Sequence, residues 1–226
     1  MNEQQLAATA NSYDRIAAEY VRHIYHELDG KPLDRAILDS FAARLVGKGT
    51  VCDMGCGPGH IARYLANRGL DMVGVDLSPG MLEQAAELNP DIAFYPGNML
   101  ALDAPDEAWA GIAAFYSIIH IPRQKCMAAL TELRRVLKPG GLLLLAFHMG
   151  DENLHETEIW GMPIDLNYWM YGSAEMAGYL EEAGYVVEEI IERDPYPPEV
   201  EYQSRRAYLV ARKPAQMATD KNGHNG

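Results

Sequence analysis

The 226-residue sequence has few cysteines and basic side chains, and it lacks a long hydrophobic run. Its three cysteines, Cys52, Cys56 and Cys126, form no Cys-x-x-Cys pair and are odd in number, which is typical of reduced thiols in a cytoplasmic protein. No apolar stretch approaches the roughly 20 residues that a membrane helix needs, and the polar, acidic N-terminus does not resemble a secretion signal. We therefore expect a cytoplasmic protein without a membrane partner.

Positive charge is also scarce, because 19 lysines and arginines stand against 32 aspartates and glutamates, for a formal net charge of −13. Binding to a phosphate backbone needs clustered basic side chains, so nucleic acid is not expected as a partner. The densest basic group, Arg134, Arg135 and Lys138, falls at the end of a predicted helix and is typical of a solvated face. The length and the 48% apolar content suit one α/β domain.

A glycine-rich turn follows the first predicted strand. Residues 50–54 form a short apolar run, and Gly55, Gly57 and Gly59 then lead into an amphipathic helix. Glycines let a backbone turn sharply and approach a ligand that a Cβ would exclude, and a strand, turn and helix N-terminus together suit a nucleotide-like ligand. A dinucleotide fingerprint would place its third glycine at position 60, which is His60, so the pattern disfavours NAD.

An aspartate ends the second predicted strand. Asp76 lies 19 residues after Gly57, the offset at which doubly wound folds place an acid against the two ribose hydroxyls. A carboxylate accepts two hydrogen bonds from such a diol and repels a 2′-phosphate. Asp76 could instead cap the helix that begins near Pro79, as Ser78 could. Because the spacing favours the ribose, turn and acid together predict a ribose-bearing cofactor.

Four motifs in this order resemble those of class I S-adenosylmethionine-dependent methyltransferases: DMGCGPG at 53–59, VDLS at 75–78, PGNM at 96–99 and LKPGGLLL at 137–144. In the third motif Asn98 stands where the family usually has an acid that holds the adenine amine. The resemblance implies S-adenosylmethionine as the cofactor and S-adenosylhomocysteine as its product, but the four motifs say little about the methyl acceptor.

The resemblance also implies which side chains bind the cofactor, on the glycine turn, the strand ends and an N-terminal helix. They are Tyr13, Tyr20, Asp53, Gly55, Gly57, Asp76, Leu77, Met81, Asn98, Met99, Tyr116 and Ser117. Tyr13 and Tyr20 would face the methionine end of the cofactor, or they could belong only to the apolar stripe of their helix.

Two histidines follow the fourth and fifth predicted strands, where open parallel sheets bind ligands. Because histidine titrates near neutrality, His120 is the first candidate for a general base and His148 the second. His120 could instead pack against the adenosine or cap a helix. The candidate acceptor-binding residues are Trp160, Tyr168, Trp169, Tyr196 and Arg205. Both tryptophans could instead anchor their loop to the sheet edge.

No metal site is expected. His148, Asp151, Glu152 and His155 gather in the sequence, but their spacing matches no strong metal-binding motif. The proline-rich loop before Arg205 also contains Glu199 and Glu201, which could attract a positively charged amine or form a solvated turn.

Strands and helices alternate from residue 50 onward, which predicts a doubly wound, Rossmann-like α/β fold with helices on both faces. The seven expected strands cover 50–54, 71–76, 91–95, 111–117, 141–148, 185–192 and 205–212, with the last one antiparallel. We expect one methyltransferase domain over 1–214, with an N-terminal helical lid at 1–47, an irregular lid loop at 149–171 and a disordered tail at 215–226.

These features predict methyl transfer from S-adenosylmethionine to an oxygen or nitrogen of a small-molecule acceptor. The protein would have to align the nucleophile behind the methyl carbon and exclude water. Two alternatives stay open: an NAD-dependent oxidoreductase, and a non-catalytic module that binds S-adenosylmethionine. The sequence does not decide between a monomer and a homodimer.

Overall fold

Seven strands form the central sheet, in the order β3-β2-β1-β4-β5-β9-β8, in a computed structural model that describes residues 1–215. The strands are β1 (Val51–Met54), β2 (Met72–Asp76), β3 (Ala93–Pro96), β4 (Trp109–Phe115), β5 (Leu137–His148), β8 (Val186–Arg193) and β9 (Arg206–Arg212). The pairs among β1 to β5 are parallel, whereas β9 runs antiparallel to both β5 and β8. The predicted seven-stranded sheet with an antiparallel last strand is confirmed.

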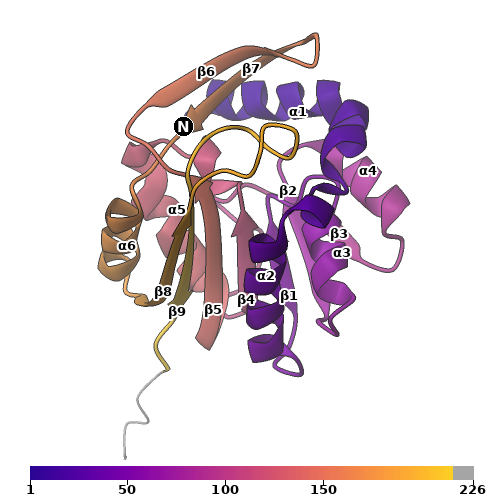
Figure 1. Cartoon of the computed structure of the whole chain (residues 1–226). Helices are drawn as coiled ribbons and strands as arrows, with labels where there is room; N and C mark the ends of the chain where they lie inside the picture. The colour runs from indigo at the N-terminus through magenta and orange to yellow at the C-terminus, as the bar shows by residue number, and fades with distance from the viewer. Residues whose placement is uncertain (216–226) are drawn as a thin grey trace, which may run out of the picture.

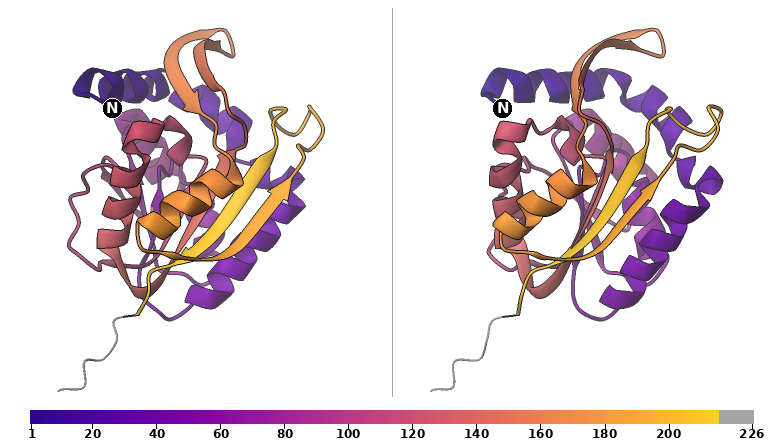
Figure 2. Two further views of the ribbon diagram at one scale, coloured as in Figure 1. Left: turned by 90° about the vertical axis from the view of Figure 1, so that its left-hand side faces the viewer. Right: turned by 60° about the vertical axis from the view of Figure 1, so that its left-hand side comes forward.

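Helices cover both faces of this sheet (Figures 1 and 2). The buried residues of α2 (Pro32–Leu45) and α3 (His60–Ala66) pack on one face, and those of α5 (Arg123–Val136) and α6 (Ser173–Glu182) pack on the other. A further helix, α4 (Pro79–Leu88), flanks β2 and β3. This layering confirms the predicted doubly wound architecture.

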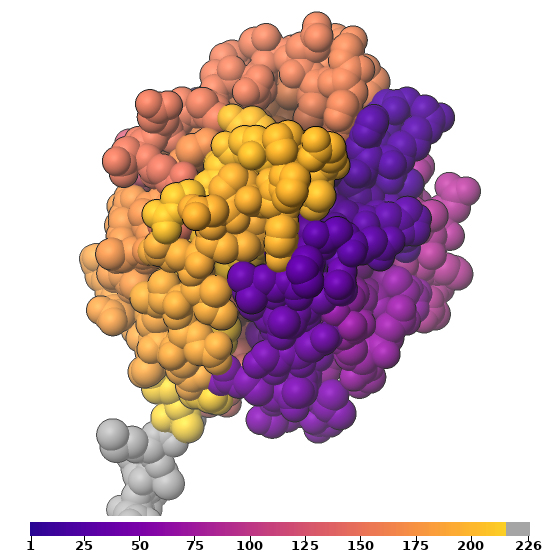
Figure 3. Space-filling view, viewed as in Figure 1, coloured from indigo at the N-terminus to yellow at the C-terminus, as the bar shows by residue number. Residues whose placement is uncertain are grey.

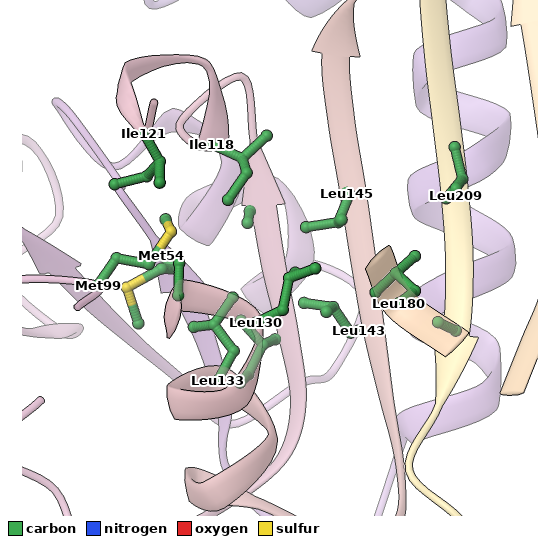
Figure 4. Packing of buried hydrophobic residues seen from close by; sticks show 14 of the residues in the cluster. Met54, Met99, Ile118, Ile121, Leu130, Leu133, Leu143, Leu145, Leu180 and Leu209 are labelled. Atoms are coloured by element: carbon green, nitrogen blue, oxygen red, sulfur yellow. The ribbon is translucent and has the colours of Figure 1, made fainter. Parts of the chain in front are cut away.

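Strand β5 shows how the sheet supplies both cores. Leu143 and Leu145 pack with Leu130 of α5 and Leu180 of α6, as Figure 4 shows. Leu144 belongs to the core on the other face, because successive side chains of a strand point to opposite sides. The near-continuous apolar run of β5 is therefore what a strand buried on both faces requires.

Residues 149–171, predicted as an irregular loop, contain a β-hairpin instead. Its strands β6 (Asn153–Ile159) and β7 (Met162–Trp169) form a separate two-stranded sheet. The turn residues Trp160 and Gly161 have φ values of 49° and 76°, the left-handed conformation that tight hairpin turns need. The prediction was wrong because β6 is mostly polar and exposed, so only the alternation in β7 marked a strand.

Helix α1 (Glu3–Ile24) lies across the carboxyl-terminal side of the sheet, with β7 and α4 packed against it (Figure 1). A 3₁₀ turn, η1 (Glu27–Gly30), then leads into α2. None of the helices within 1–215 has the length and apolar character needed to cross a membrane. The tail expected from residue 215 lies almost wholly outside the described residues.

Candidate active site

A cavity of about 280 Å³ lies beyond the carboxyl ends of β1, β2 and β4, beneath α1. All the residues predicted to bind the cofactor line it: Tyr13, Tyr20, Asp53, Gly55, Gly57, Asp76, Leu77, Met81, Asn98, Met99, Tyr116 and Ser117. The two candidate bases, His120 and His148, line the same cavity. Residues far apart in the sequence are therefore brought together at the edge where open sheets bind ligands.

The glycine turn leaves space that side chains would fill. Gly55 and Gly57 have φ values of 73° and 50°, which favour glycine. A Cβ on Gly55 would collide with the side chain of Ser117, whereas one on Gly57 would meet only Tyr20 Cε1, at 3.8 Å. The backbone of Gly57 thus borders the cavity and is open to a close-lying ligand.

Two buried carboxylates fix this turn. Asp53 Oδ2 accepts a hydrogen bond from the backbone N–H of Ala62 at 2.9 Å, and burial raises the pKa of Asp53 to about 7. Asp76 accepts hydrogen bonds from the backbone N–H groups of Gly57 and Ser78, both at 2.8 Å. Burial raises the pKa of Asp76. Since a carboxylate has about four acceptor positions, Asp76 retains capacity for a ligand.

The alternative role for Asp76, capping the following helix, belongs to its neighbour. Ser78 is the N-cap of α4, and its Oγ accepts from the backbone N–H of Met81 at 3.1 Å. The same hydroxyl lies 2.6 Å from Asp14 Oδ1 on α1. Ser78 therefore connects α1 to the start of α4.

His120 joins the sheet edge to both covering elements. Its Nε2 lies 2.7 Å from the Tyr13 hydroxyl on α1, and its Nδ1 lies 3.1 Å from the carbonyl oxygen of Asn167 on β7. Because a carbonyl only accepts, Nδ1 carries the proton and Nε2 accepts from Tyr13. Burial lowers the pKa of His120 to about 4, so the ring is neutral at pH 7.

His148 has the opposite proton arrangement. Its Nδ1 lies 2.7 Å from Nη1 of Arg206 and 2.7 Å from Oγ of Ser204. A guanidinium only donates, so Nδ1 is the acceptor and the proton of the neutral ring is on Nε2. Burial first, and then the charges of Arg206 and Lys31, lower the pKa of His148 to about 3.

The backbone of Tyr116, whose ring lies beside His148, turns sharply. Tyr116 has a φ of 55°, which ends β4 at Phe115 instead of at 117 as predicted, and a 3₁₀ turn, η2 (Ile118–His120), follows. Such a conformation is costly for a residue with a side chain, and it occurs most often at functional sites. The Tyr116 ring lies 5.2 Å from the His148 ring, between centroids.

Ionisable side chains that the sequence analysis did not assign to the site also line the cavity: Glu27, Lys31, His60 and Arg206. Glu201, which the sequence offered either as an amine-binding group or as part of a solvated turn, lines it too, whereas Glu199 does not. Glu27 lies 2.5 Å from Lys31 Nζ and 3.0 Å from His60 Nε2. Lys31 in turn lies 3.5 Å from Glu201, in the loop between β8 and β9. In Figure 3 this loop lies against the N-terminal segment and the hairpin.

Of the predicted acceptor-binding aromatic residues, only Tyr168 lines the cavity, with its ring 5.0 Å from the His120 ring between centroids. Trp160 stacks on His23 at the tip of the hairpin, with 4.4 Å between ring centroids. Trp169 lines a neighbouring hollow of about 240 Å³. Neither tryptophan is on the cavity wall.

The two predictions in the β8–β9 segment also lie outside the lining. The Tyr196 hydroxyl accepts from the backbone N–H of Leu33 at 2.9 Å, and Arg205 pairs with Glu192 at 2.9 Å on the surface. The arginine on the cavity wall is the next residue, Arg206. Successive side chains of a strand point to opposite sides. Which of Arg205 and Arg206 points toward the cavity therefore depends on where β9 begins, which is at Arg206.

The strand order, the glycine turn after β1 and the acid at the end of β2 define a class I S-adenosylmethionine-dependent methyltransferase domain. A family model described as a methyltransferase domain matches residues 51–141. S-adenosylmethionine is the methyl donor of this class, and these findings favour it over NAD.

Relatives with assigned functions extend the likeness. A malonyl-[acyl-carrier protein] O-methyltransferase of Erwinia billingiae is 33% identical over 164 residues, which cover 70% of this chain and 60% of the relative. A demethylmenaquinone methyltransferase of Beutenbergia cavernae is 32% identical over 112 residues, covering 50% of this chain and 45% of the relative. The chain thus spans about half the length of these relatives.

Solved structures share the fold at lower identity. A SAM-dependent methyltransferase from Methanosarcina mazei has a TM-score of 0.68 at 15% identity, over 77% of this chain and 97% of that chain. A DhpI–SAH complex has a TM-score of 0.74 at 19% identity, over 95% of this chain and 99% of that chain. At these identities the likeness concerns the fold alone.

Proposed function

We propose that this protein transfers the methyl group of S-adenosylmethionine to an oxygen or nitrogen of a small-molecule acceptor. One observation carries the proposal: a single cavity contains both the glycine turn with Asp76 and the two neutral histidines, His120 and His148. The first set suits a ribose-bearing cofactor, and the second provides polar groups for an acceptor. Helix α1 and the hairpin cover this edge, which limits access of water.

The cofactor fits the residues around the turn. In this proposal Asp76 accepts from the ribose hydroxyls, Asn98 accepts from the adenine amine, and the backbone beside Gly57 borders the methionine portion. Gly57 leaves room for a polar ligand, and the buried Nδ1 of His60 on the same wall has no hydrogen-bond partner among residues 1–215. Both observations support this assignment. When bound, S-adenosylmethionine supplies a methyl group on a positively charged sulfur, which is an activated leaving group.

The protein then contributes position and proton transfer. Holding two reactants in line can supply about 7–11 kcal/mol of the barrier reduction. His120 is the proposed base and acts through Tyr13, because the lone pair on its Nε2 accepts the hydrogen bond of the Tyr13 hydroxyl. An acceptor proton can pass to the Tyr13 oxygen as the Tyr13 proton passes to His120. Burial keeps the pKa of Tyr13 well above 10, so a free tyrosinate is not required.

Calorimetric titration with S-adenosylhomocysteine tests the cofactor assignment. We expect binding to the wild type and at least tenfold weaker binding to Asp76→Ala, because two hydrogen bonds to a charged acceptor are lost. Asp71→Ala is the matched control: Asp71 lies at the opposite end of β2, is exposed and contacts Thr50. Binding of NAD in place of S-adenosylhomocysteine would contradict the proposal.

Methyl transfer itself is measured with methyl-labelled S-adenosylmethionine and a panel of phenols, hydroxy acids, amino acids and hydroquinones. We expect labelled product from at least one class. Tight S-adenosylhomocysteine binding with no labelled product from any class would favour the non-catalytic module instead.

A further inference from the structure

Arg206 is the most deeply buried cation on the cavity wall. It begins β9, directly opposite His148 in the register with β5, and its side chain is 2% exposed. Its guanidinium carbon lies 5.5 Å from the centre of the Tyr116 ring. The start of β9 thus places a fixed positive charge next to the end of β5.

One of the three guanidinium nitrogens of Arg206 makes no hydrogen bond to another described residue. Nη1 donates to the Ser204 carbonyl at 2.8 Å and to His148 Nδ1 at 2.7 Å, and Nη2 donates to the Tyr202 carbonyl at 2.8 Å. Nη1 also contacts Ser204 Oγ. Nε is buried and has no hydrogen-bond partner within residues 1–215. An unsatisfied buried donor destabilises the fold, and more so when it is charged.

The charge of Arg206 is also poorly matched. Its nearest carboxylate, Glu201 Oε2, lies 3.6 Å from Nη2, beyond hydrogen-bond distance. Glu201 is occupied by Arg193 Nη2 at 2.9 Å and by the backbone N–H of Tyr196 at 2.7 Å, and it also lies 3.5 Å from Lys31. One buried carboxylate therefore serves three cations, of which Arg206 is the most weakly paired.

The other two cations have carboxylates of their own. Lys31 pairs with Glu27 at 2.5 Å, and Arg193 pairs with Asp34 at 3.1 Å. Arg206 has no second carboxylate among the described ion pairs. Its remaining neighbour, neutral His148, accepts at Nδ1 and so has an N–H at Nε2. Arg206 and His148 together provide donors and positive charge but no anion.

We propose that Arg206 and His148 bind an anionic oxygen group of the methyl acceptor, a carboxylate or a phosphonate. This inference rests on the proposed methyl transfer and deepens it by naming the acceptor class. The anion completes the hydrogen bonding of the guanidinium, and His148 acts as a hydrogen-bond donor instead of a base. The acceptor is then an acid whose anionic end is held near β5 and whose nucleophile faces His120.

Calorimetry on the S-adenosylhomocysteine complex tests this, with benzoate, its neutral analogue benzamide, and phenylphosphonate as probes. We expect benzoate or phenylphosphonate to bind at least tenfold more tightly than benzamide, and the stronger of the two identifies the anion. Arg206→Met should weaken that binding at least tenfold and leave S-adenosylhomocysteine affinity within twofold. Arg212→Met is the matched control, since it removes the same charge from the opposite end of β9.

The comparison of benzoate with benzamide uses the wild-type protein, so it tests for an anion-binding site even if Arg206→Met fails to fold. Equal binding of the charged and neutral probes, or no binding of any probe, would overturn the inference while S-adenosylhomocysteine binding still supports the proposed function. A loss of S-adenosylhomocysteine affinity in folded Arg206→Met would also overturn it, because Arg206 would then hold the cofactor's own carboxylate.

Discussion

The two histidines of the cavity show how hydrogen-bond partners divide roles between identical side chains. His120 follows β4 and His148 ends β5, and burial keeps both rings neutral. A carbonyl at Nδ1 of His120 leaves a lone pair at Nε2, whereas a guanidinium at Nδ1 of His148 leaves a proton there. The sequence placed both near the site but carried no information on these partners, which come from β7 and β9.

His120→Gln tests the base. We expect kcat to fall by about 10²–10⁴ with an acceptor that carries a transferable proton, because general-base catalysis is typically worth this factor. S-adenosylhomocysteine affinity should stay within twofold, measured by calorimetry on the same preparation. His155→Gln is the control, since His155 is an exposed histidine on the hairpin that pairs with Asp165. An unchanged kcat in His120→Gln would remove it as the base.

The pH dependence of stability follows from the same burial. Because folding lowers the pKa of His148 from 6.5 to about 3, the unfolded chain binds more protons between these values. The contribution of His148 to the free energy of unfolding is therefore complete above pH 6.5. It decreases on acidification, by up to about 1.4 kcal/mol per pH unit.

Denaturant unfolding of wild type and His148→Gln between pH 7 and 4.5 measures this contribution. We expect the variant to lose less stability on acidification. Asp53, whose raised pKa acts in the opposite sense, is present in both proteins, so its effect cancels in the difference. Parallel stability curves would show that His148 is not buried as a neutral ring.

Among the secondary-structure elements, the hairpin and α1 form one covering layer. Ile164 and Leu166 of β7 pack with Ile16 and Ala17 of α1, and Arg15 donates to the Pro163 carbonyl at 2.7 Å. The sequence predicted the helix from its 3.6-residue period, but the hairpin was missed because its apolar alternation is confined to one strand. Side chains of this layer, among them Tyr13 of α1 and Tyr168 of β7, line the cavity.

Leu166→Ala tests the layer. Its side chain is fully buried, and large-to-small changes of this kind cost about 2–5 kcal/mol. We expect faster amide hydrogen exchange in α1 and faster release of S-adenosylhomocysteine, followed by exchange mass spectrometry and stopped-flow displacement. Leu88→Ala, at an exposed leucine ending α4, should change neither. Equal exchange in wild type and Leu166→Ala would show that the hairpin does not hold α1 down.

Across the whole molecule, the seven-stranded sheet with its antiparallel last strand was predictable because local apolar patterns and short connections constrain it strongly. The network of buried ion pairs beside the cavity was not predictable, since it joins Lys31 and Asp34 near the N-terminus to Arg193, Glu201 and Arg206 near the end of the chain. No local pattern marks such pairing. The choice between Arg205 and Arg206 likewise depends on where β9 begins, a boundary that composition leaves uncertain by a residue or two.

The central claim is that this cavity holds the adenosyl cofactor with its sulfur toward the side lined by His120 and Arg206. A crystal structure with S-adenosylhomocysteine tests this claim most directly. We predict ribose hydroxyls within hydrogen-bond distance of Asp76 and a sulfur atom facing the space between His120 and Arg206. A ligand bound elsewhere, or a sulfur atom turned toward solvent with Asp76 uncontacted, would contradict the account.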